Sequence, residues 1–251
     1  SPFLQKNSAA QYVRDLAQYT QKKGAEIRIL VPRFGLINER KNRLHEVVRL
    51  SGVNIRVGDK VNALLIKVAS IPNTKLQVYF IDNEEYFKRK AVFHDSHDRP
   101  FEDNGERIIF FCKSVLETAK KLGWPPDVIH CHDWMTSLVP AYFKAVYHKD
   151  PILKQAKVLW TLHNNVIKGN WDKDMLSKAR MDGMKAATLD SLKTADFQGL
   201  IKTGLQYADA VRSAEPLTDP AFKELINTQS APCLSNSEED LQAYYRLYED
   251  L

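Results

Sequence analysis

Six polar side chains lie at the ends of two short segments and could bind a small hydrophilic ligand. The first segment spans residues 127–136 (DVIHCHDWMT) and the second spans residues 158–165 (VLWTLHNN). Imidazole, carboxylate and carboxamide groups all form hydrogen bonds, and the first two also exchange protons. The candidate residues are His130, His132, Asp133, His163, Asn164 and Asn165. Polar groups concentrated directly after apolar residues are typical of a binding site.

Two apolar strands are expected to position these side chains. Val128 and Ile129, like residues 158–162, form short apolar runs that are bounded by polar residues and separated by one predicted helix. Such runs are typical of buried parallel strands. In an open parallel sheet, ligands bind outside the carboxyl ends of the strands. We therefore expect the six candidates to converge on one edge of a sheet.

The first half of the chain alternates between predicted helices and strands. Helical spacing over residues 9–23 ends at Gly24, and a strand follows over residues 27–31. Residues 63–70 and 76–81 read as two strands joined by a tight turn. Asp103 and Glu106 resemble the start of a capped helix that ends at Gly123.

The second half continues this alternation. A helix is predicted near residues 137–147, and helix, strand and helix follow over residues 200–226. Residues 166–198 are rich in Lys and Asp with weak periodicity, which predicts an insertion or flap near the site. Residues 235–238 offer a capping box for a last helix. We expect one domain over residues 1–251, an α/β Rossmann-like three-layer sandwich with a mainly parallel sheet.

Composition excludes several classes of protein. A chain of 251 residues that is 44% hydrophobic can bury a large core. It contains no apolar stretch of 18 residues and no signal peptide at its start, which predicts a cytoplasmic protein without a membrane partner. The net charge of +5 is too mild and too dispersed for a nucleic-acid reader. Cys112, Cys131 and Cys233 are widely spaced, which indicates free thiols.

Several motifs follow one another in a fixed order along the chain. They are VPRFG (31–35), YFID (79–82), DNGER (103–107), DVIHCHDW (127–134), LVP (138–140), TLHN (161–164) and KTGLQYAD (202–209). Together they span most of the sequence and resemble the N-terminal domain of bacterial glycogen/starch synthases. The tract of residues 37–52 is similar to that of a short bacterial subgroup that consists of this domain alone.

The resemblance implies an activity and a catalytic pair. Members of that family transfer glucose from ADP-glucose or UDP-glucose to the end of an α-1,4-glucan with retention, need no metal or other cofactor, and have a two-domain GT-B architecture. This chain would correspond to the N-terminal half. The resemblance places His163 beside the donor sugar and Asp133 near the reacting glucose units. A carboxylate there could accept sugar hydroxyls or stabilise positive charge on the ring.

The resemblance also implies further contacts and partners. The remaining expected substrate-binding residues are His130, His132, Asn164, Asn165 and Lys6. The expected partners are the α-glucan and the nucleotide sugar, with a homo-oligomer or a separate C-terminal-domain protein as a possible addition.

Two departures from the family pattern bear on activity. The family's Lys-Thr-Gly-Gly-Leu loop, which binds the donor diphosphate, corresponds to residues 5–9, which read QKNSA and lack the paired glycines. Lys6 could replace that loop only as a point charge. The C-terminal nucleotide-binding domain and a first strand before Ser1 are expected in the family and are missing from this sequence.

Alternative interpretations therefore stay open. His163 could be a residue that caps a strand end, and Asp133 could cap the helix that follows it. His130 and His132 share a strand face, which invites a metal site, but further ligands are lacking and a metal hydrolase is disfavoured. At the level of function, a glucosyltransferase competes with a non-catalytic relative that binds glucan or regulates a partner, and with one half of a split enzyme.

Overall fold

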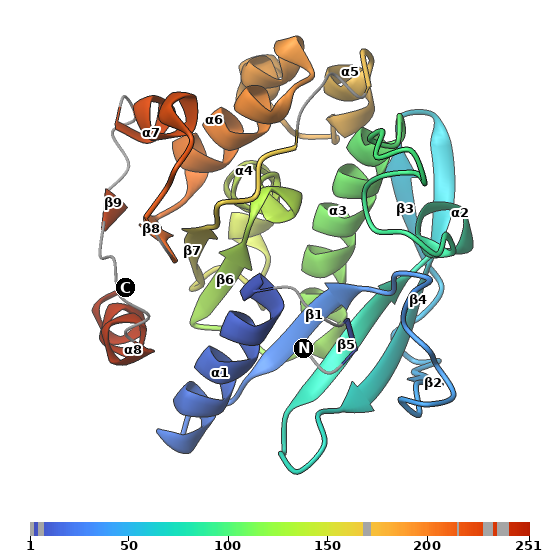
Figure 1. Ribbon diagram of the computed structural model, residues 1–251, viewed down its shortest axis with the longest axis vertical. Helices are drawn as coiled ribbons and strands as arrows, with labels where there is room; N and C mark the ends of the chain where they lie inside the picture. The colour runs from blue at the N-terminus through green and yellow to red at the C-terminus, as the bar shows by residue number, and fades with distance from the viewer. Residues whose placement is uncertain (1–2, 5–7, 168–171, 215, 228–232, 235–240) are drawn as a thin grey trace. The chain divides into compact units, whose positions relative to one another are not determined.

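A computed structural model of the protein describes residues 3–4, 8–167, 172–214, 216–227, 233–234 and 241–251. The chain forms two compact α/β units, each with its own sheet (Figure 1). Unit 1 consists of Ser1–Asn54, Asn62–Val92 and Asp240–Leu251, and unit 2 consists of Ile55–Val61 and Phe93–Glu239. The expected α/β class is confirmed, whereas one domain over the whole chain stays a prediction.

The sheet of unit 1 is mixed. Strand β1 (Arg28–Pro32) pairs in parallel with β5 (Gln77–Asp82), and β4 (Lys60–Ser70) runs antiparallel to both β5 and β2 (His45–Glu46). The strand β3 (Val53–Val57), which the sequence did not predict, pairs with β4. Because β1 and β5 run in the same direction, their carboxyl ends lie at the same edge.

Two helices from opposite ends of the chain pack together in unit 1. The helix α1 (Ser8–Lys22) contacts α8 (Leu241–Asp250), and the rings of Tyr12 and Tyr244 meet edge to face with centroids 5.7 Å apart. A short helix, α2 (Glu84–Phe87), follows β5 directly. The predicted capping box before α8 lies outside the described residues.

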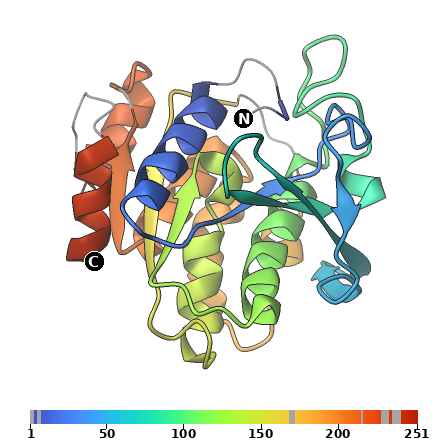
Figure 2. The same cartoon turned by 90° about the horizontal axis from the view of Figure 1, so that it is seen from below.

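The sheet of unit 2 is entirely parallel, as the sequence predicted. Its strand order is β6 (Val128–His132), β7 (Lys157–Leu162), β8 (Ala210–Ser213) and β9 (Cys233–Leu234). Figure 2 shows β6, β7 and β8 side by side. Residues 158–162 of β7 are all buried, which explains their uninterrupted apolar pattern.

Several helices complete unit 2. They are α3 (Asn104–Leu122), η1 (Trp134–Thr136), α4 (Val139–Ala145), η2 (Tyr147–Lys149), α5 (Met175–Ala179), η3 (Ala186–Thr194), α6 (Phe197–Tyr207) and α7 (Pro220–Asn227). Helix α4 contacts both α3 and α6. None of the helices that the structure describes is long and apolar enough to cross a membrane.

The ends of α3 confirm one expectation and correct another. Gly123 ends the helix in the left-handed conformation that glycine favours, with φ 65°. The predicted capping box at the start is wrong, because Asp103 has a nearly helical backbone (φ −88°, ψ 11°) and its side chain makes no cap hydrogen bond. Glu106 instead accepts a hydrogen bond from Lys178 at 2.7 Å.

The segment expected to be an insertion or flap is helical and packed over residues 172–198. Met175, Leu189 and Leu192 are buried in unit 2. Lys178 bonds both Glu106 and Asp172, which fastens α5 to the start of α3. The weak periodicity of this segment reflects short helices, and its role as a flap stays a prediction.

Candidate functional site

Three histidines meet at the carboxyl ends of β6 and β7. The register of these strands places His132 opposite Thr161, and His163 follows the end of β7. His130 Nε2 and Thr161 Oγ1 are 2.7 Å apart, and the rings of His130 and His132 lie 4.0 Å apart between centroids. His132 Nδ1 lies 3.4 Å from His163 Nε2. The predicted convergence is therefore observed for these residues.

The electrostatic environment keeps at least two of these rings neutral. Burial, with the neighbouring His163 and Arg212 charges, lowers the pKa of His130 to about 3. Burial and the neighbouring His130 and His163 hold the pKa of His132 well below its usual value. A neutral imidazole presents one donor and one acceptor, so His130 and His132 can match hydroxyl groups without adding charge. His130, His132 and His163 together are called the histidine row below.

Asp133 occupies a strained turn directly after β6. Its backbone adopts φ 65° and ψ 173°, a region that is essentially reserved for glycine. Its carboxylate accepts hydrogen bonds from the Trp134 amide at 2.8 Å and from Asn165 Nδ2 at 2.6 Å. The backbone N–H donates to Thr161 O at 2.9 Å, and the carbonyl accepts from Trp160 Nε1 at 3.0 Å. Asp133 therefore caps η1, and its surroundings fix both its backbone and its carboxylate.

Asn164 forms hydrogen bonds to a distant segment of the chain, which the sequence did not predict. Its Nδ2 donates to Pro216 O at 2.5 Å, and its Oδ1 accepts from the Thr218 amide at 2.8 Å. The carboxamide therefore holds the segment that follows β8. A substrate contact by Asn164 stays a prediction, and Lys6 lies outside the described residues.

Sequence reasoning missed two supports of the site. Arg212 is only 2% exposed and lies opposite Thr161 in the register of β8 and β7. An arginine within a short apolar strand was the signal that could have marked it. The Phe93 ring lies 4.5 Å from the Trp134 ring, and the Arg107 guanidinium lies over Phe93 at 5.9 Å. Arg107 of the DNGER motif thus contacts Phe93, which packs against Trp134, the residue that follows Asp133.

The described residues offer little for a metal ion. No group of three His, Cys, Asp or Glu side chains among them is arranged to hold one. Cys112 and Cys131 are buried free thiols, and burial raises the pKa of Cys112 to about 12. The side chain of Cys233 is not among those described.

The parallel sheet and the polar edge of unit 2 define an α/β domain with a candidate ligand site, and comparison with known proteins identifies its family. The profile of the starch synthase catalytic domain matches residues 1–219, and the chain belongs to this family. The glycogen synthase of Chlorobaculum tepidum is 41% identical over 216 residues, which cover 84% of this chain and 43% of that protein. The glycogen synthase of Chlorobium phaeovibrioides is 35% identical over 239 residues, covering 95% and 47%.

A solved structure shows the same fold. The catalytic domain of Starch Synthase IV from Arabidopsis thaliana, bound to ADP and acarbose, matches with a TM-score of 0.74 at 19% identity. The match covers 95% of this chain and 49% of that chain. The chain therefore has the fold of the N-terminal half of a GT-B enzyme, and it spans less than half the length of the curated relatives reported above.

Proposed function

We propose that this chain is the sugar-binding half of a glycogen/starch synthase-type glucosyltransferase. It would bind an α-1,4-glucan and ADP-glucose or UDP-glucose, and support transfer of glucose with retention. Family membership supports the reaction class. The observation that carries the proposal is the row of close histidines beside a carboxylate held in a strained turn.

The geometry fits the chemistry of glucosyl transfer. Positive charge develops on the sugar ring as the glycosidic bond breaks, in an oxocarbenium-like transition state. Neutral rings at His130 and His132 add no opposing charge, while the fixed carboxylate of Asp133 favours a cationic ring. We infer that His163 and Asp133 contact the reacting glucose, and that His132 orients His163 through their 3.4 Å contact.

A second candidate function is a glucan-binding or regulatory subunit, or one half of a split enzyme. Residues 5–9 read QKNSA and lack the paired glycines that let a backbone approach a diphosphate. This observation favours a chain that binds glucan and depends on other groups for the donor. Both functions use the same histidine row for glucose.

The test compares His163→Gln with a control, His97→Gln, whose side chain is 75% exposed. Titration calorimetry with maltoheptaose should show binding to the natural chain and to the control, and roughly tenfold weaker binding to His163→Gln, since a lost hydrogen bond in a desolvated site costs about 1–3 kcal/mol. Equal affinity in all three proteins would contradict the site. A second assay measures transfer of labelled glucose from ADP-glucose or UDP-glucose by the natural chain. Transfer supports the glucosyltransferase, and glucan binding without transfer supports the accessory protein or the half of a split enzyme.

A further inference from the structure

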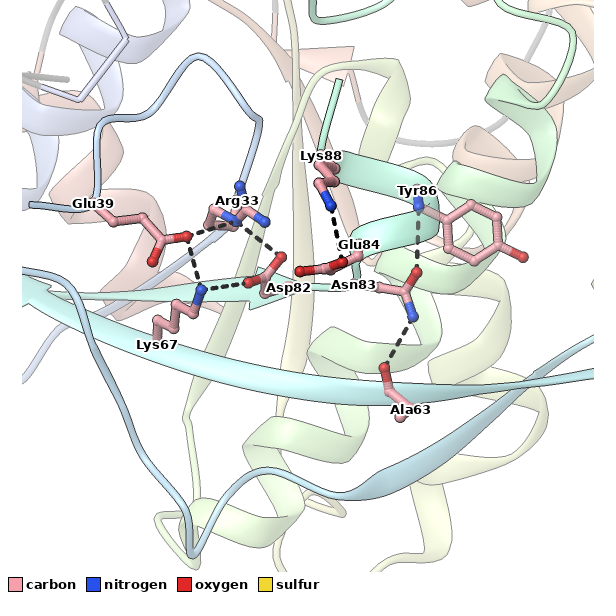
Figure 3. Close-up of polar contacts among 9 residues, drawn as sticks. All are labelled: Arg33, Glu39, Ala63, Lys67, Asp82, Asn83, Glu84, Tyr86 and Lys88. Atoms are coloured by element: carbon pink, nitrogen blue, oxygen red, sulfur yellow. Dashed lines mark hydrogen bonds and ion pairs between the residues drawn. The ribbon is translucent and has the colours of Figure 1, made fainter. Parts of the chain in front are cut away.

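A second group of charged side chains lies at the carboxyl ends of β1 and β5 in unit 1 (Figure 3). Arg33 follows β1 directly, and Asp82 is the last residue of β5. Arg33 Nε donates to Asp82 Oδ1 at 2.9 Å, and Lys67 Nζ lies 2.9 Å from Asp82 Oδ2. Glu39 Oε1 accepts from Lys67 at 2.7 Å and lies 3.4 Å from Arg33 Nε. Two cations and two carboxylates therefore balance one another in a closed network.

The network holds its members in place. The side chain of Asp82 is 1% exposed, so its charge requires partners of the opposite sign. Burial alone would lower the pKa of Lys67, but hydrogen bonds to Glu39 and Asp82 outweigh it and raise that pKa above its usual value. The contacts of Nε with Asp82 and Glu39 set the orientation of Arg33.

Arg33 uses one of its three nitrogens in this network. Both dashed lines from its guanidinium leave Nε, and within the described parts of the chain no hydrogen bond reaches Nη1 or Nη2. The guanidinium is planar, so a fixed Nε–H also fixes the direction of the outer edge with its two Nη groups. The side chain as a whole is 10% exposed, so most of its length is packed against the protein. The outer edge is therefore held in place and can donate two parallel hydrogen bonds to a ligand.

The surroundings favour an anion over a neutral ligand. Gly35 lies so close to the backbone of Lys88 and Arg89 that a Cβ there would overlap the Lys88 carbonyl. This contact brings the basic residues 88–90 beside the segment that follows β1. The same segment carries exposed side chains at Arg40, Lys41 and Arg43. Lys88 is paired with Glu84 at 3.2 Å. The excess positive charge on the segment that follows β1 therefore comes from Arg40, Lys41 and Arg43.

We propose that the outer edge of Arg33 binds a phosphate-type oxyanion at the carboxyl ends of β1 and β5. A guanidinium presents two parallel N–H groups that match two oxygens of one phosphate. The diphosphate of a nucleotide and free inorganic phosphate share this chemistry. The site uses no residue of the histidine row, and only its nucleotide-diphosphate form rests on the proposed binding of ADP-glucose or UDP-glucose.

The test replaces Arg33 with lysine, which keeps the charge beside Asp82 and removes the outer edge. Titration calorimetry in phosphate-free buffer uses ADP and inorganic phosphate as separate ligands. Affinity should fall about tenfold in Arg33→Lys, because lysine cannot form the bidentate contact. The control Arg40→Lys, an exposed position on the same segment, should stay within about twofold of the natural chain.

The two ligands identify the source of the oxyanion. Loss of ADP binding alone in Arg33→Lys assigns the site to a nucleotide diphosphate, and loss of phosphate binding as well assigns it to phosphate itself. The proposal is overturned if the natural chain binds neither ligand, or if Arg33→Lys binds both as the natural chain does. Maltoheptaose binding should be unchanged in Arg33→Lys, so failure here and failure of the histidine site are distinguishable.

A measurement on the natural chain covers the case in which Arg33→Lys does not fold. Phenylglyoxal modifies accessible guanidinium groups, and mass spectrometry locates the modified residues. ADP or phosphate should slow modification at Arg33 and leave the rate at Arg40 unchanged. Equal rates at Arg33 with and without either ligand would refute the proposal.

Discussion

Replacing Asp133 by glycine and by alanine separates backbone strain from side-chain chemistry. A residue other than glycine at φ 65° and ψ 173° costs of the order of 1–3 kcal/mol. Alanine keeps this strain and loses the hydrogen bonds to Trp134 and Asn165, a loss of about 0.5–2 kcal/mol. Glycine loses the same bonds but relieves the strain, against about 0.5–1 kcal/mol of added chain entropy in the unfolded state.

The Asp133→Gly protein should therefore be more stable than Asp133→Ala by about 1–2 kcal/mol, the difference between strain relief and chain entropy. For a chain of this size, that corresponds to a melting temperature roughly 2–8 °C higher. Differential scanning calorimetry measures it. Asp174 is a matched control, because its φ is −96° and its side chain makes no cap hydrogen bond. There the advantage of glycine over alanine should be smaller than at Asp133, because glycine is preferred at a helix N-cap but relieves no strain at this φ.

The relative melting temperatures of Asp133→Gly and Asp133→Ala test whether the turn is strained. If Asp133→Ala melts at or above Asp133→Gly, the turn is not strained and the argument from strain to function is refuted. Both variants lack the carboxylate, so both should bind maltoheptaose more weakly than the natural chain. Asp133→Ala should also melt below the natural chain, because the carboxylate caps η1.

Two further predictions concern the interior of unit 2. Lys113 is 3% exposed and donates to the carbonyls of Arg56 and Arg180, and burial, followed by the Arg56 charge, lowers its pKa to about 8. Between pH 8 and the ordinary value of 10.5 the unfolded chain holds a proton that the folded chain has released, so stability should rise with pH by roughly 3 kcal/mol relative to Lys113→Met. The free energy of unfolding in urea is measured against pH for the natural chain and for Lys113→Met. A constant difference between the two proteins from pH 8 to 10.5 would contradict this prediction. Gly204→Ala should cost about 1–3 kcal/mol, because its Cβ would overlap the Trp160 ring, and an unchanged melting temperature would show that α6 can shift away from β7.

The sequence predicted the main strands of the site because its signals there are local. Uninterrupted apolar residues in β7 and the polar residues that follow both β6 and β7 fix where each strand ends. Parallel pairing then brings those ends to the same edge. Gly123 was equally predictable, since only a left-handed residue was needed after α3.

The supports of the site depend on contacts between distant residues and were not predictable. Asn164 binds Pro216, which is 52 positions away in the sequence, and no local pattern marks that pair. Asp133 carries no sequence sign of a left-handed backbone, since aspartate is common in ordinary caps as well. Arg33 and Asp82 are paired across 49 positions, and the sequence marks each only as part of a family motif.

The central claim is that the histidines at the ends of β6 and β7 bind glucose units and that His130 and His132 do so as neutral rings. The most direct measurement is nuclear magnetic resonance of ¹⁵N-labelled histidine rings, titrated with pH and then with maltoheptaose. His130 should stay neutral to at least pH 5, and the pKa of His132 should lie well below its usual value of 6.5. The signals of His130, His132 and His163 should shift when the glucan binds. Titration of His130 and His132 near pH 6.5 would contradict the account. Ring ¹⁵N signals that do not change when maltoheptaose is added would contradict it as well.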